Sequence, residues 1–145
     1  MKKKLPLIII TDDCWRYLAL LKHLLSENLR AEILATTNAA EAVAWALNEP
    51  PVLFITDIVH PGLDGIEALR MLKWNKRTED VAVWVISGSV PEIFSPGALE
   101  AMGADFVGTK PCELGILIEK ARVLCRTKPL KTSSARNKPG DSSLN

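Results

Sequence analysis

Residues 52–65 read Val52-Leu53-Phe54-Ile55-Thr56-Asp57-Ile58-Val59-His60-Pro61-Gly62-Leu63-Asp64-Gly65. The stretch begins with an apolar run that shows no polar alternation, which is typical of a strand buried on both faces in a parallel sheet. Asp57 follows where this run ends. Asp64 lies three residues before Glu67, and this spacing is typical of a helix N-cap. The stretch therefore predicts a buried strand, a short loop that carries an acidic residue, and a helix.

Four more apolar runs recur along the chain at similar spacing. They are Leu7–Thr11, Ala31–Thr36, Val81–Ile86 and Asp105–Thr109. Segments with helical periodicity lie between and after the runs. They are Cys14–Glu27, Asn38–Asn48, a segment that starts at Asp64, a short one from Ser95 to Gly103, and a last one from Leu114. This alternation predicts right-handed βαβ units and an α/β fold with a doubly wound, five-stranded parallel sheet covered by helices on both faces.

The first helix and the helix starts carry specific signals. Trp15, Leu18, Leu21 and Leu25 fall on one stripe and are predicted to pack together on the sheet. Asn38 with Glu41 three residues on has a capping pattern, and Ser95 before a proline is a second N-cap candidate.

Length, composition and charge fit one domain with a separate tail. The chain has 145 residues, of which 48% are apolar, enough for a sizeable core. Residues 126–145 hold five basic side chains against one acidic side chain, a net charge of +4, which leaves −3 for the remainder. A mildly acidic body does not favour nucleic-acid binding. The absence of apolar periodicity from Thr127 onward predicts a folded domain at 1–126 and a disordered basic tail at 127–145.

The compartment is predicted from cysteines and apolar segments. Cys14, Cys112 and Cys125 form no C-x-x-C pair, and their odd number argues against a disulfide framework. The apolar run Leu5–Ile10 is too short for a signal peptide, and no stretch approaches the ~20 apolar residues of a membrane span. We therefore expect a cytoplasmic protein without a membrane partner.

Polar residues follow four of the predicted strands. Asp12 and Asp13 follow the first, Asp57 follows the third, Ser87 ends the fourth, and Lys110 follows the fifth. Binding sites in doubly wound sheets form beyond the carboxyl ends of the strands. Each residue alone could be an ordinary cap or loop residue, but all five at neighbouring strand ends indicate a site.

The chemistry of this group is specific. Three neighbouring carboxylates repel one another, and a hard divalent cation removes that conflict. Mg²⁺ prefers such oxygen ligands and keeps several waters. A carboxylate can also attack phosphorus and form an acyl phosphate, while Lys110 and Ser87 stabilise the transferred group.

Four segments together resemble a known family. They are Thr11-Asp12-Asp13, the stretch from Asp57 to Gly65, Ser87-Gly88, and Gly103-Ala104-Asp105 with Lys110-Pro111. The chain is similar over residues 7 to about 126 to the receiver domain of bacterial two-component response regulators. The resemblance implies a flavodoxin-like sheet with strand order 2-1-3-4-5.

The resemblance also implies roles for the acidic residues. Asp57 would be the phosphoacceptor. Asp13 and Asp57 would bind Mg²⁺ directly with the backbone carbonyl of Val59, and Asp12 would act largely through a bound water.

For the switch, the resemblance implies that the Ser87 hydroxyl closes on the phosphoryl group and that Lys110 pairs with it. The Lys110–Pro111 bond is expected to be cis. The family often has an aromatic residue three positions before the lysine, where this chain has Val107. Because side chains alternate along a strand, Phe106 should point to the other face.

The sequence thus predicts a stand-alone signalling switch and not an enzyme with an external substrate. A histidine kinase or histidine phosphotransfer protein would supply the phosphoryl group, and output would be contact with a downstream protein, as a monomer or weak dimer. The alternative, an aspartate-nucleophile phosphatase, would require an Asp-x-Asp motif at the end of the first strand. This chain has the adjacent pair Asp12-Asp13 there, which argues against it. A flavin or nucleotide binder would need a phosphate-binding loop there, and these carboxylates would repel a phosphate.

Overall fold

The structure is a computed structural model that describes residues 4–59, 62–88, 95–110 and 112–127. Five strands form one parallel sheet in the order β2-β1-β3-β4-β5. The strands are β1 (Leu7–Thr11), β2 (Glu32–Thr36), β3 (Leu53–Thr56), β4 (Ala82–Ser87) and β5 (Phe106–Thr109). The predicted fold is confirmed, and the strand boundaries differ from the predicted ones by no more than one residue.

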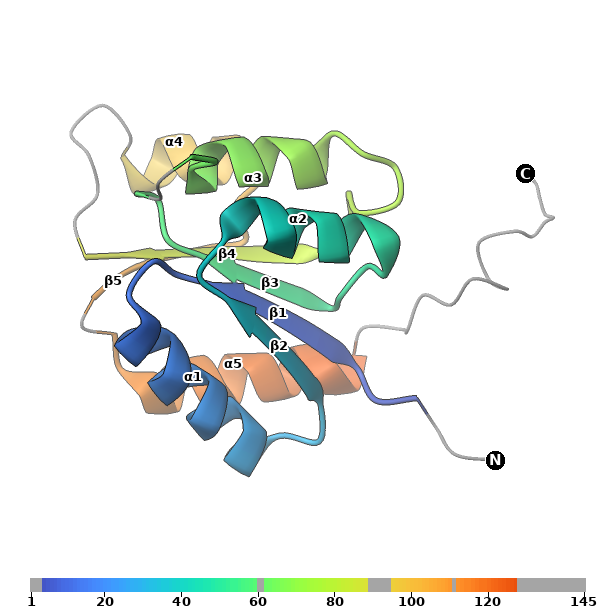
Figure 1. Cartoon of the computed structure of the whole chain (residues 1–145), viewed down its shortest axis with the longest axis vertical. Helices are drawn as coiled ribbons and strands as arrows, with labels where there is room; N and C mark the ends of the chain where they lie inside the picture. Colours follow the sequence, from blue (N-terminus) through green and yellow to red (C-terminus); the bar gives the residue numbers. More distant parts are fainter. Residues whose placement is uncertain (1–3, 60–61, 89–94, 111, 128–145) are drawn as a thin grey trace, which may run out of the picture.

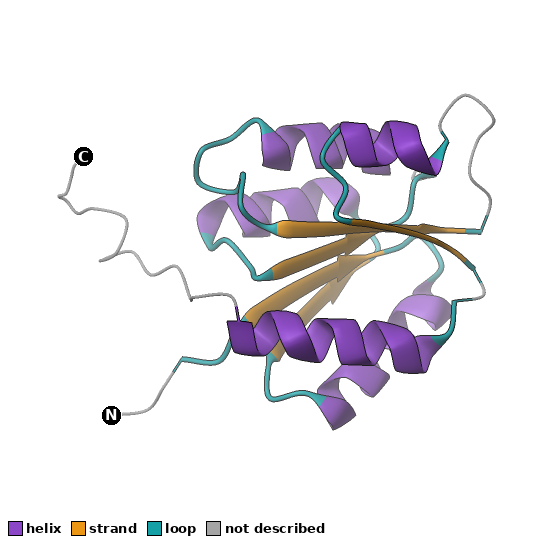
Figure 2. Ribbon diagram, turned by 180° about the vertical axis from the view of Figure 1, so that it is seen from behind, coloured by secondary structure: helices purple, strands orange, loops and turns teal. Residues whose placement is uncertain are grey.

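Helices cover both faces of the sheet. They are α1 (Trp15–Asn28), α2 (Ala39–Asn48), α3 (Gly65–Lys73), α4 (Pro96–Ala101) and α5 (Leu114–Thr127). Helices α1 and α5 lie on one face, and α2, α3 and α4 lie on the other (Figures 1 and 2). None of these helices, which are all within the described ranges, has the length and apolar character that a membrane crossing requires.

The apolar strands explain the two-layered core. Successive residues of a strand point to opposite faces of the sheet, so every apolar run contributes side chains to two cores, one on each face. Phe54 packs in the core under α2, α3 and α4, whereas its neighbours Leu53 and Ile55 pack in the core with α1 and α5. All four residues of β3 are buried.

The predicted helix caps are confirmed. The side chain of Asn38 accepts a hydrogen bond from the backbone N–H of Glu41, and Asp64 accepts one from Glu67. Ser95 accepts one from the N–H of Ala98. These bonds satisfy N–H groups that have no partner inside a helix.

One sequence expectation needs correction. Trp15 is not part of the core stripe of α1, because it is 64% exposed while Leu18, Leu21 and Leu25 are buried. Helix α5 includes Thr127, whose hydroxyl donates to the carbonyl of Val123. The rest of the tail and the predicted cis bond to Pro111 lie outside the described residues.

Candidate functional site

The strand order brings the ends of β1 and β3 together. These two strands pair in parallel, and Thr11 is opposite Thr56. Asp12 and Asp57 each come one residue later, so both emerge at the same edge of the sheet. The crossovers that leave β1 and β3 run to opposite faces, which opens the sheet edge at this switch point.

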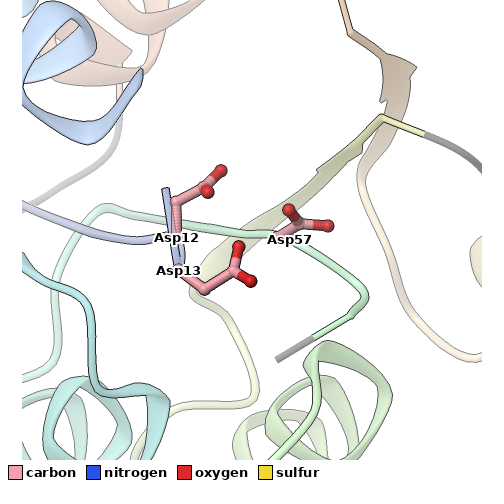
Figure 3. A group of neighbouring side chains, drawn as sticks. All are labelled: Asp12, Asp13 and Asp57. Carbon is pink, nitrogen blue, oxygen red and sulfur yellow. The ribbon is translucent and has the colours of Figure 1, made fainter. Parts of the chain in front are cut away.

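The three predicted carboxylates lie side by side at this edge. Asp12, Asp13 and Asp57 each offer an oxygen within 4.8 Å of the others (Figure 3). Asp12 and Asp57 are buried, while Asp13 is exposed. The group therefore has two carboxylates fixed in the protein and one at its open side.

Asp57 is held rigidly by the backbone around it. One of its carboxylate oxygens, Oδ1, accepts hydrogen bonds from the N–H groups of Ile58 at 2.6 Å and Val59 at 3.3 Å. The hydroxyl of Thr56 donates to the backbone carbonyl of Asp57 at 2.9 Å. The side chain of Val59 is 59% exposed. That its carbonyl is a metal ligand stays a prediction.

Lys110 reaches the carboxylates from β5. Its backbone N–H donates to the carbonyl of Ser87 at 2.8 Å, which fixes the start of the side chain beside the end of β4. Its Nζ lies 2.5 Å from Oδ2 of Asp12 and 3.1 Å from Oδ2 of Asp57. Lys110 is thus a shared partner of both buried carboxylates.

Ser87 occupies the predicted position. It is the last residue of β4 and is 2% exposed. All the predicted site side chains, which are Asp12, Asp13, Asp57, Ser87 and Lys110, therefore come from the carboxyl ends of adjacent strands.

Burial and pairing shift the pKa values in this cluster. Burial raises the pKa of Asp12 above its ordinary value, although the hydrogen bond from Lys110 opposes the rise. Burial alone would lower the pKa of Lys110, but its hydrogen bonds to Asp12 and Asp57 outweigh this effect, so that pKa is raised. Lys110 therefore stays a cation at neutral pH.

The donor set fits Mg²⁺. Three ionised carboxylates and one ammonium leave two negative charges on a compact group of oxygens. A divalent cation would neutralise both charges, and oxygen ligands are those that Mg²⁺ prefers. The fit rests on the charge and the donor type of residues that the structure places together.

Phe106 and Val107, the residue at the family's usual aromatic position, point to opposite faces of β5. Phe106 packs in the core with α1 and α5 and meets the ring of Trp84 edge to face, at 5.6 Å between ring centroids. Val107 packs against the other core. The predicted opposite orientation of Phe106 and Val107 is confirmed.

Sequence reasoning missed Tyr17, which lies against the site from α1. The Nζ of Lys110 lies 4.4 Å from the centroid of its ring. Tyr17 follows the helical spacing of Leu21, so periodicity could have placed it toward the sheet. Its contact with Lys110 depends on the loop after β5, which is remote in sequence.

We expect Tyr17 to ionise about two pH units above a free tyrosine. Burial raises its pKa to about 12, the charge of Cys112 adds to the rise, and Lys110 opposes it. Because the folded-state pKa exceeds the unfolded value of about 10, this group leaves stability unchanged below pH 10 and lowers it as pH rises toward 12. Tyr17 is the single tyrosine of the chain, so phenolate absorbance reports it alone.

Absorbance read immediately after a pH jump, before alkaline unfolding, should give this midpoint. The chain in denaturant should titrate near the unfolded value. A folded-state midpoint equal to that of the denatured chain would contradict the burial of the phenol.

Comparisons with known proteins identify the family of the chain. The family model of the response regulator receiver domain matches residues 8–122. The response regulator PleD of Caulobacter vibrioides is 28% identical over 121 residues, which are 83% of this chain and 26% of PleD. The protein PilH of Pseudomonas aeruginosa is 28% identical over 112 residues, 77% of this chain and 91% of PilH. This chain thus spans about a quarter of PleD and most of PilH.

A solved structure gives the same result. The signal receiver domain of a signal transduction histidine kinase from Syntrophus aciditrophicus has a TM-score of 0.73 and 26% identity, covering 88% of this chain and 98% of that one. The family match spans most of the chain, and the described site residues stand at the strand ends where the sequence placed them. This chain belongs to the response regulator receiver domain family of two-component signalling systems.

Proposed function

We propose that this chain is a phosphorylatable signalling switch that takes a phosphoryl group on Asp57. The observation that carries the proposal is the contact of Asp57 with the Lys110 ammonium, beside the carboxylates of Asp12 and Asp13. The carboxylate of Asp57 is oriented by two backbone N–H groups and one ammonium. These bonds hold the carboxylate in position as a nucleophile.

In the proposed step, an Asp57 carboxylate oxygen attacks the phosphorus of a phosphohistidine. A P–O bond forms to Asp57, and the P–N bond to the donor imidazole breaks. The donor ring, protonated on its other nitrogen, takes the electron pair and leaves as neutral imidazole. A carboxylate nucleophile carries no proton to remove, so the group needs no general base. The donor would be a histidine kinase or a histidine phosphotransfer protein.

Mg²⁺ would be held by Asp12, Asp13 and Asp57 with the Val59 carbonyl, and it would neutralise charge on the transferred phosphoryl group. Lys110 then pairs with an oxygen of that group, since its Nζ already contacts Asp57. The Ser87 hydroxyl closes on another oxygen. Output follows through contact with a downstream protein and, because Val107 is not aromatic, without an aromatic rotamer change at that position.

A small phosphodonor tests the proposal. The intact protein should gain the mass of one phosphoryl group when Mg²⁺ is present and none when a chelator removes it, because the uncompensated carboxylates repel the donor. Intact-mass spectrometry measures the labelled fraction over time. Labelling that proceeds equally well with chelator would remove the metal from the proposal.

A further inference from the structure

Tyr17 completes the surroundings of the Lys110 ammonium. The Nζ of Lys110 lies 4.4 Å from the centroid of the Tyr17 ring, well within the distance of a cation–π contact. The same Nζ contacts the carboxylates of Asp12 and Asp57. The ammonium is therefore held between two carboxylates and the face of an aromatic ring.

The hydroxyl of Tyr17 has no part in this contact. Its oxygen is buried and has no hydrogen-bond partner among the residues that the structure describes. A buried tyrosine hydroxyl normally finds a partner, and an unpaired one is unfavourable. The ring of Tyr17 is thus the part that contacts Lys110, and its unpaired hydroxyl adds nothing to the stability of the folded protein.

We propose that Tyr17 is a positioning residue for phosphoryl transfer, acting through Lys110. Lysine has a flexible four-carbon side chain, and ordering it opposes binding. The ring restricts where Nζ can lie without occupying any of its hydrogen-bond donors. Nζ then remains beside Asp57, where an oxygen of the incoming phosphoryl group needs a cation. This inference rests on the proposed function of Asp57.

Removing the ring should slow labelling of Asp57. A cation–π contact of ordinary strength corresponds to a fall of about threefold to tenfold in the rate for Tyr17→Leu with a small donor and Mg²⁺. Tyr17→Phe should restore the rate, because it keeps the ring and removes only the unpaired hydroxyl. If both variants lose rate equally, or if Tyr17→Leu labels like the wild type, the proposal is overturned.

A double-mutant cycle separates positioning from a general loss of packing. In a Lys110→Ala background, Tyr17→Leu should cause no further fall in the labelling rate, because its target is gone. An equal fall in both backgrounds would mean that Tyr17 acts by packing alone and would overturn the proposal. If Tyr17→Leu does not fold, Tyr17→Met takes its place in the same cycle with the same outcomes.

A spectroscopic readout keeps this inference distinct from the proposed function. Protons on the carbon next to Nζ of Lys110 should show an upfield ring-current shift in the wild type and Tyr17→Phe, and lose it in Tyr17→Leu. The same shift in all three proteins would overturn the ring contact. A wild type that shows the shift but takes no label would instead contradict the proposed function of Asp57.

Discussion

Gly65→Ala should lower the free energy of unfolding by at least about 3 kcal/mol, because there is no space for a side chain at this position. A Cβ on Gly65 would lie 1.9 Å from the carbonyl oxygen of Asp57 and 2.8 Å from its carbonyl carbon. Both are backbone atoms, so no side-chain rotation relieves the clash. Denaturant unfolding followed by circular dichroism measures the loss.

The clash acts directly on the site. The Asp57 carbonyl is already held by the Thr56 hydroxyl, and the N–H of Gly65 donates to the carbonyl of Ile58 at 2.9 Å. Any shift that accommodates a methyl group must therefore move the backbone of Asp57. A Gly65→Ala protein that is still folded at low temperature should also label more slowly.

Gly115→Ala is the matched control for this prediction. Gly115 also lies in the first turn of a helix, α5, but a Cβ there would meet nothing within 4 Å. The change should be neutral or stabilise by up to about 1 kcal/mol, since alanine favours the helix. Equal unfolding midpoints for the two variants would contradict the close approach of α3 to Asp57.

Asp57→Asn should abolish labelling by a small phosphodonor. The amide is a poor nucleophile, and the change also removes one of the three anionic oxygen donors of the proposed metal site. We expect no phosphoryl mass under conditions in which the wild type is fully labelled. The variant should remain folded, because asparagine is nearly the same size and can still accept from the N–H groups of Ile58 and Val59.

Asp64→Asn is the matched control for the acceptor. Asp64 lies in the same loop-to-helix segment, but its side chain caps α3 by accepting from the N–H of Glu67. Asparagine is an equally good N-cap, so stability and labelling should both be retained. Labelling of Asp57→Asn to the level of Asp64→Asn would show that another residue takes the phosphoryl group.

The strands and helices could be predicted because their signals were local and repeated, whereas the strand order was predicted from the family resemblance. The apolar residues of β3 and β4 have no polar alternation, and both strands are buried on both faces. The cap residues Asn38 and Asp64 stood directly before their helices, where their side chains do accept from the helix N–H groups. Neither signal depends on remote parts of the chain.

The convergence of the site residues was also predictable. The carboxyl ends of parallel strands all lie at one edge of the sheet. Residues that directly follow the strands therefore come together there, regardless of the loop conformations. This places Asp12 and Asp57 together from strand order alone. The contact of Lys110 with both carboxylates also needed a side chain long enough to reach past the end of β4 to Asp57, which follows β3, and to Asp12, which follows β1.

What the sequence did not reveal depends on the exact positions of neighbouring elements. Trp15 fits the apolar stripe of α1 by spacing, but it is the first residue of the helix and is exposed. The contact of Tyr17 with Lys110 and the approach of Gly65 to Asp57 each join two separate elements. No local pattern records such distances.

The most direct test of the central claim is to locate the phosphoryl group in the labelled wild type. Borohydride reduction converts an aspartyl phosphate to homoserine, and peptide mass spectrometry then identifies the modified residue. We predict that the whole label is at Asp57, with Mg²⁺ required for its appearance. Label at Asp12, Asp13 or Asp64, or at any residue other than an aspartate, would contradict the assignment of Asp57 as the acceptor.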